Sequence, residues 1–116
     1  MKEFLLVFRA HSNGTPPSPE QMQASMKQWQ NWLGSIAAQD KLVNSGNRLA
    51  SEGKVVKPDN VVTNGPYVEM AEAIGGYSII KADTLEEAVE ISKGCPILSV
   101  NGNVEVRAIV PMDNNS

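Results

Sequence analysis

Phe4-Leu5-Leu6-Val7-Phe8-Arg9, close to the start of the chain, is the stretch that decides the fold. Its two alternating sets of side chains, Phe4/Leu6/Phe8 and Leu5/Val7, are both apolar, which is typical of a strand covered on both faces. We therefore expect this strand to lie in the middle of a sheet. A run of only five apolar residues before an arginine is too short for a signal peptide or a membrane span.

The next element along the chain is a long helix, expected after a loop of turn-forming residues at 11–17. Residues 18–21, Ser-Pro-Glu-Gln, are a typical helix start, because Ser18 can cap the helix and Gln21 can close a capping box. Apolar side chains then recur at spacings of four and three, which predicts one helix over about 18–39. The residues of this stripe are Met22, Met26, Trp29, Leu33 and Ile36. Trp32 lies beside the stripe, where it either covers the edge of the core or meets a partner chain.

The rest of the chain is predicted to supply three more strands, an inserted hairpin and a second helix. In chain order these are a polar extended segment at 42–50, a hairpin of 54–57 and 61–63, a strand at 75–82, a helix of about three turns from residue 85, and a strand at 104–110. Without the hairpin, this is the βαββαβ order of a ferredoxin-like α+β domain. We expect that domain to cover residues 1–112, with 113–116 as a frayed tail.

The two helices of such a domain cover one face of its sheet and leave the other face bare. Because the first strand is apolar on both sides, the bare face needs a cover, which only a second copy of the chain or a large ligand could supply. We therefore predict a homodimer built sheet to sheet about a two-fold axis.

Composition narrows the classes of function. The 116-residue chain has a formal net charge of -3 and no block of consecutive Lys or Arg, so we expect no direct binding to nucleic acid. The single cysteine, Cys95, can form neither an internal disulfide nor a paired zinc site, which fits a cytoplasmic protein. Gly75-Gly76 resembles no nucleotide-binding loop, and neither a metal nor a cofactor is predicted.

A family resemblance enters at Asn64-Gly65-Pro66-Tyr67-Val68-Glu69-Met70-Ala71-Glu72, followed by Ile74-Gly75-Gly76-Tyr77. This segment resembles the signature of the YCII-related, or DGPF-domain, family, which reads Asp-Gly-Pro-Phe-Ala-Glu-Thr-Lys-Glu and then Gly-Gly-Tyr or Gly-Gly-Phe. The resemblance implies a dimeric α/β barrel, in which two ferredoxin-like sheets pack together with clefts between them. It implies no settled activity: some relatives are linked to transcription initiation because such domains occur with sigma factors, and others are thought to be small-molecule enzymes.

The departures from that signature bear on mechanism. Asn64 stands where the family has Asp, and Ala71 stands where it has Lys. If those two groups served acid–base chemistry in the family, this chain has lost both. If the Asp instead holds a turn, Asn64 can still do so, because Asn and Asp make the same kind of side-chain turn.

Three arginines are candidate ligand-binding residues. Arg9, Arg48 and Arg107 each lie in or at the end of a predicted strand, and a ferredoxin-like sheet could bring them toward one cleft. Guanidinium groups bind planar oxyanions in a bidentate way, so the cluster would suit a carboxylate or another small anion. The alternative is that each arginine is solvated or pairs locally with a carboxylate of Glu3, Glu69, Glu72 or Glu105.

His11 is the candidate catalytic residue, because it is the only histidine and follows directly on a strand. It could serve as a general acid or base, or it could be a solvated loop residue. Tyr67 and Tyr77 could orient a ligand through their hydroxyls or pack at the sheet edge. Glu69 is a further candidate for ligand binding and otherwise a solvated acid. Cys95 fits the core better than the role of a nucleophile.

Three functions follow as hypotheses. The first is a homodimer that binds a small polar or anionic molecule in a cleft near Asn64 and Tyr67, at the dimer interface. The second is a small-molecule isomerase or hydrolase that uses His11 as its proton carrier. The third is an interaction module tied to transcription initiation through a sigma-factor partner.

Overall fold

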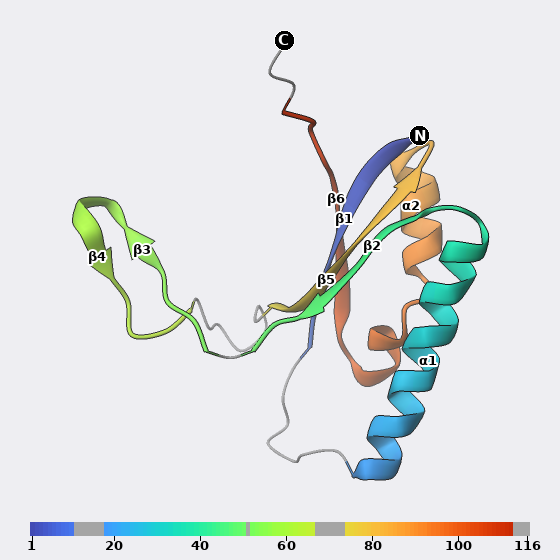
Figure 1. Cartoon of the computed structure of the whole chain (residues 1–116), viewed down its shortest axis with the longest axis horizontal. Coiled ribbons are helices and arrows are strands. Elements are labelled where there is room, and N and C mark those ends of the chain that lie inside the picture. The colour runs from blue at the N-terminus through green and yellow to red at the C-terminus, as the bar shows by residue number, and fades with distance from the viewer. Residues whose placement is uncertain (11–17, 51, 67–73, 113–116) are drawn as a thin grey trace.

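A four-stranded antiparallel sheet forms the body of the computed structural model, which describes residues 1–10, 18–50, 52–66 and 74–112. The strands are β1 (Lys2–Arg9), β2 (Leu42–Arg48), β5 (Ile74–Ala82) and β6 (Asn103–Ala108), in the spatial order β2-β5-β1-β6 (Figure 1). β1 pairs with β5 on one side and with β6 on the other, which confirms its central position. The architecture is α+β, and its strand order is that of a ferredoxin-like βαββαβ domain.

Two helices, α1 (Pro19–Ala38) and α2 (Leu85–Ser92), lie on the same face of this sheet (Figure 1). The predicted capping box starts α1: the Ser18 hydroxyl accepts from the Gln21 N–H at 3.1 Å, and the Gln21 side-chain oxygen accepts from the Ser18 N–H at 2.9 Å. Thr84 caps α2 by accepting from the Glu87 N–H at 3.1 Å. With eight residues, α2 is shorter than the predicted three turns. A short 3₁₀ helix, η2 (Pro96–Val100), follows it.

The hydrophobic core lies between the helices and the sheet. Its buried members are Phe4, Leu6, Phe8, Trp32, Ile36, Ile80, Ala82, Ala88, Cys95 and Ile97. Trp32 packs edge-on to Trp29, with ring centroids 5.7 Å apart, and its indole N–H donates to the Ile91 carbonyl at 3.1 Å. Trp32 was predicted to lie either at the edge of the core or against a partner chain. The structure shows it in the core of its own chain.

The first half of α1 differs from the predicted core stripe. Every residue from Pro19 to Gln28 is exposed, including Met22 and Met26, whose exposed fractions are 47% and 58%. The spacing of the stripe is helical along its whole length, but only the part from Trp29 onward packs against the described core. Periodicity therefore predicted the helix correctly but not the length over which a partner surface covers it.

The predicted hairpin is present as a separate two-stranded sheet that projects from the body (Figure 1). Its strands, β3 (Val56–Lys57) and β4 (Val61–Val62), are joined by a single 3₁₀ turn, η1 (Pro58–Asn60). Val56 is 71% exposed, so the described residues bury little of the hairpin. Among the described helices, none is long and apolar enough to cross a membrane.

Candidate functional site

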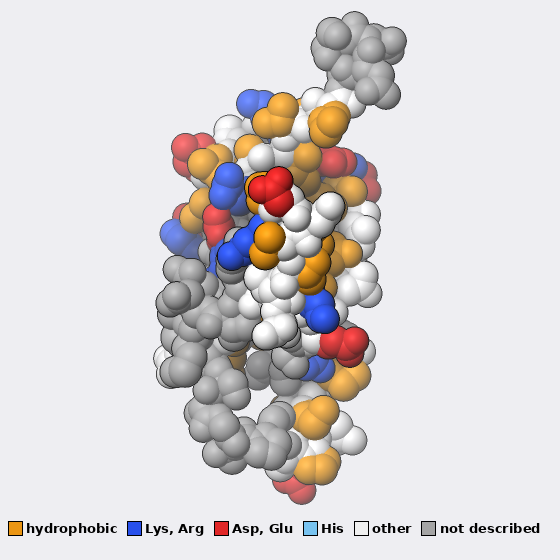
Figure 2. All heavy atoms as spheres, turned by 90° about the vertical axis from the view of Figure 1, so that its left-hand side faces the viewer, with side chains coloured by type: hydrophobic (Ala, Val, Ile, Leu, Met, Phe, Trp, Pro, Cys, Tyr) orange, Lys and Arg blue, Asp and Glu red, His pale blue; other side chains and the backbone are white. Residues whose placement is uncertain are grey.

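The face of the sheet opposite the helices, called the open face below, is built from two rows of side chains that cross all four strands. Strand register places Asn47, Tyr77, Val7 and Glu105 side by side in the first row, and Asn44, Ile79, Leu5 and Arg107 in the second. Each row is apolar or aromatic in the middle, amide at the β2 edge and charged at the β6 edge. Figure 2 views the molecule from the side away from the helices, with the hairpin nearest the viewer.

The middle of the open face confirms that the first strand is apolar on both of its faces. Val7 is buried at 9% exposure, and Leu5, Tyr77 and Ile79 are half-buried. None of these four belongs to the core cluster under the helices. The open face therefore carries apolar surface that α1 and α2 do not cover.

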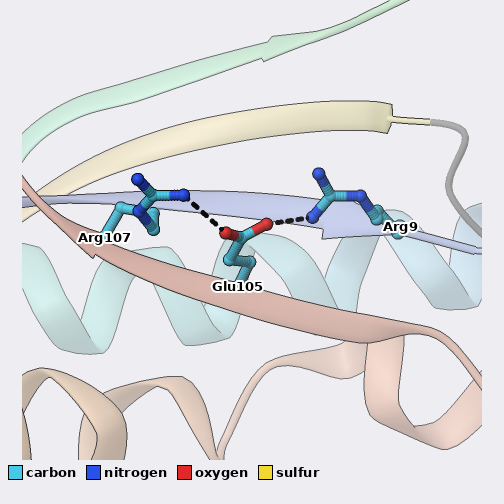
Figure 3. Close-up of polar contacts among 3 residues, drawn as sticks. All are labelled: Arg9, Glu105 and Arg107. Atoms are coloured by element: carbon cyan, nitrogen blue, oxygen red, sulfur yellow. Dashed lines mark hydrogen bonds and ion pairs between the residues drawn. The ribbon is translucent and has the colours of Figure 1, made fainter. Parts of the chain in front are cut away.

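One carboxylate joins two arginines at the charged edge. Glu105 accepts from Arg9 Nη1 through one oxygen at 2.5 Å and from Arg107 Nη1 through the other at 3.0 Å (Figure 3). These hydrogen bonds, that of Arg107 first, hold the pKa of Glu105 below its ordinary value. Of the alternatives for Arg9 and Arg107, local pairing with Glu105 is therefore what the structure shows.

Arg107 still has capacity for a ligand. Its guanidinium has five N–H donors, more than the one carboxylate of Glu105 can use. The side chain of Arg107 is 70% exposed, whereas that of Glu105 is 36% exposed. Arg107 can therefore accept a second anion, with Glu105 fixing its position.

The amide edge depends on a glycine in β2. Gly46 has a positive φ of 77°, and a Cβ built there would lie 1.6 Å from the Tyr77 carbonyl oxygen, so only glycine fits this bulge. The bulge places Asn47 opposite Tyr77, where the Asn47 side-chain amide donates to the Tyr77 hydroxyl at 3.2 Å. The Tyr77 hydroxyl is thus held in a fixed position rather than simply solvated.

Arg48 does not join the other two arginines. In the register of the sheet it lies opposite Gly76, which in turn faces Phe8. Phe8 belongs to the core, so this row is on the helix side of the sheet. Within the described ranges, Arg48 makes no ion pair. The structure therefore brings two of the three predicted arginines together and places the third on the other face.

Asn64 lies at the base of the hairpin rather than on the open face. It lines a shallow hollow formed by Glu52, Gly53, Lys54, Asn64, Gly65 and Pro66. The Thr63 hydroxyl holds this turn, because it accepts from the Val55 N–H at 2.8 Å and donates to the Gly65 carbonyl. No residue of the two open-face rows lines the hollow.

Three candidate residues, His11, Tyr67 and Glu69, lie outside the described residues. Their proposed roles stay predictions. Cys95 is buried at 3% exposure, and burial raises its pKa to about 11. A thiol with so high a pKa is a poor nucleophile at neutral pH, which agrees with the predicted core role. In the part of the chain that the structure describes, no three His, Cys, Asp or Glu side chains are grouped to hold a metal ion.

Sequence reasoning did not single out the amides of the open face or the bridging role of Glu105. The polar segment at 42–50 was a signal for Asn44 and Asn47, and the alternation in 104–110 was a signal for Glu105. A search of curated proteins found no match. The model of the YCII-related domain family, in contrast, matches residues 3–113, nearly the whole chain. The chain therefore belongs to the YCII-related domain family.

Proposed function

We propose that this YCII-related domain works as a homodimer packed through its open face and binds a small polar or anionic molecule in a cleft near that interface. The apolar centre of the open face, which α1 and α2 do not cover, supports the dimer, because contiguous apolar surface marks an interaction site. A second copy related by a two-fold axis presents the same surface and is the simplest cover.

The observation that carries the ligand proposal is the layout of the two open-face rows. An apolar centre lies between fixed hydrogen-bonding groups at one edge, Asn47 and Tyr77, and cationic groups at the other, Arg9 and Arg107. Small-molecule sites typically combine apolar walls with a few positioned polar groups. Two guanidinium groups favour a carboxylate or another planar oxyanion as the ligand.

The oligomeric part of the proposal is tested by placing a charge in the centre of the open face. We expect Ile79→Glu to reduce the mass measured by light scattering, because it would bury an unpaired carboxylate of each copy in the apolar interface. Met26→Glu is the matched control, since Met26 is 58% exposed on α1 and lies away from the open face. Equal masses for both variants and the wild type would refute an interface on this face.

The ligand part is tested by thermal shift across a panel of small carboxylates. We expect at least one carboxylate to raise the melting temperature of the wild type and to lose most of that effect in Arg107→Ala. Lys93→Ala is the matched control, because Lys93 is an exposed cation that pairs with Glu90 on α2. A panel without any shift in the wild type would remove the ligand from the proposal and leave the dimer to its own test.

A further inference from the structure

In the described part of the chain, the outer edge of β6 is an unpaired strand edge. β6 lies at the end of the sheet order and pairs only with β1 among the described strands. It is six residues long and pairs in unbroken register from Phe4↔Ala108 to Arg9↔Asn103. The other edge strand, β2, is interrupted by bulges. A regular edge strand presents a row of unpaired N–H and C=O groups that can accept another strand.

The register shows which backbone groups of β6 point outward. The Ile109 N–H donates to the Glu3 carbonyl at 3.0 Å, and in an antiparallel pair such bonded positions recur at every second residue. Asn103, Glu105 and Arg107 therefore turn their backbone groups toward β1. The N–H and C=O groups of Val104, Val106 and Ala108 point away from β1, to the free edge.

The side chains of β6 have a charge pattern that complements itself. Glu105 and Arg107 stand on either side of Val106, both on the open face. When two copies of β6 run antiparallel about a two-fold axis at Val106, Glu105 of each copy lies opposite Arg107 of the other. Opposite charges at directly opposed positions stabilise a strand pair.

The same axis also matches the backbone groups. It places Val106 opposite Val106 and Val104 opposite Ala108, which are the residues whose backbone groups point outward. About six hydrogen bonds can form in this register, and Glu105 and Arg107 fall at the non-bonded positions, where opposed side chains come closest. An axis shifted by one residue, to Glu105 or Arg107, would also match outward backbone groups, but it would place that residue opposite its own copy, and like charges at directly opposed positions destabilise a strand pair.

We propose that β6 pairs antiparallel with β6 of a second copy of this chain about a two-fold axis at Val106, joining two sheets edge to edge. This interface goes beyond the proposed function and does not depend on it, since it joins the edge of the sheet through β6 and needs no contact with the apolar centre of the open face. Charged residues on an edge strand can also serve to prevent pairing. Here, however, the two charges are opposite in sign and symmetric about one residue, which favours pairing with an identical strand.

Backbone pairing is tested by Ala108→Pro. Ala108 is exposed and its N–H points outward, so proline removes a donor from the free edge and leaves the bonds between β1 and β6 in place. We expect light scattering at about 100 µM to give half the wild-type mass. Ala108→Ser keeps the N–H and is the control, expected to keep the wild-type mass. Circular dichroism checks that both variants are folded.

Charge pairing is tested by exchanging the charges at positions 105 and 107. This exchange also tests the edge interface if the proline variant does not fold. Arg107→Glu alone places two glutamates opposite each other and is expected to raise the dissociation constant roughly tenfold. The double variant Glu105→Arg/Arg107→Glu restores opposite charges and is expected to recover most of that loss. No recovery, or a wild type with the monomer mass of 12.5 kDa, overturns the proposal.

The two interfaces are separable in these experiments. If both exist, the wild type is at least a tetramer, and Ala108→Pro and Ile79→Glu each leave a dimer. If only the edge exists, Ile79→Glu keeps the wild-type mass and Ala108→Pro gives monomer. A fall in mass with Ile79→Glu alone, and none with Ala108→Pro, supports the open face and refutes the edge.

Discussion

Leu5 and Leu6 are neighbours in β1 that point to opposite faces of the sheet, and truncating each to alanine tests the two faces separately. Leu6 is fully buried in the core under the helices. Leu6→Ala removes its transfer free energy and leaves a cavity, for a loss of about 3 to 5 kcal/mol. That loss belongs to a single chain, so it should not depend on protein concentration.

Leu5 is half-buried on the open face, so its loss depends on whether a second copy covers that face. In a lone chain, Leu5→Ala gives up about half the benefit of a buried leucine, about 1 kcal/mol. In a face-to-face dimer the side chain is buried fully, and the loss rises to about 2 to 3 kcal/mol. The free energy of unfolding of Leu5→Ala, relative to wild type, should therefore depend on concentration.

The assay is urea unfolding followed by the fluorescence of Trp29 and Trp32, at protein concentrations that differ about a hundredfold. A domain of this size has a total stability of about 5 to 15 kcal/mol, so each loss is a measurable fraction of the whole. The reasoning fails if Leu5→Ala costs the same at both concentrations. It fails equally if the loss for Leu6→Ala varies with concentration as that of Leu5→Ala does.

Three further variants test local features. Trp32→Phe should lower the free energy of unfolding by about 1 kcal/mol in urea, because the Ile91 carbonyl loses the indole donor and keeps only the Gly94 N–H at 3.3 Å. A neutral effect would show that the indole bond is not needed. Gly46→Ala should cost about 2 kcal/mol or more and shift the amide signals of β2 in NMR spectra, because its Cβ would collide with the Tyr77 carbonyl; unchanged spectra would contradict the bulge. Burial raises the pKa of Cys95 to about 11, above that of an unfolded thiol, so the unfolded chain binds fewer protons than the folded one between about pH 9 and 11. The free energy of unfolding of the wild type should therefore fall over this range relative to that of Cys95→Ala. Rapid reaction of the folded protein with Ellman's reagent at pH 8 would contradict a buried thiol.

Elements fixed by local sequence could be predicted well. The capping box at Ser18 and Gln21 depends on residues three apart, and the structure contains both of its hydrogen bonds. The doubly apolar pattern of β1 predicted its central position, because few other environments tolerate such a strand. The order of the elements then left few alternatives to a ferredoxin-like sheet.

Features that depend on register between distant strands could not be predicted. Arg9 and Glu105 are 96 residues apart, and their contact follows from how β1 and β6 align. A shift of one residue moves a side chain to the other face, and for that reason Arg48 lies on the helix side while Arg9 and Arg107 share the open face. Periodicity likewise predicted α1 but could not show where its partner surface ends, so Met22 and Met26 are exposed.

The proposed edge interface and the proposed ligand both use Arg107. Within one chain Arg107 pairs with Glu105, at the β6 edge it would face Glu105 of the second copy, and on the open face it would hold a carboxylate. Because a guanidinium has a limited number of donors in one plane, a bound carboxylate weakens its pairing across the edge. Coupling between two binding events is reciprocal, so edge pairing must lower carboxylate affinity by the same factor. Light scattering at a saturating concentration of carboxylate gives the dissociation constant of the edge interface, and its change measures this coupling directly. An unchanged dissociation constant would show that Arg107 does not serve both the edge interface and the carboxylate.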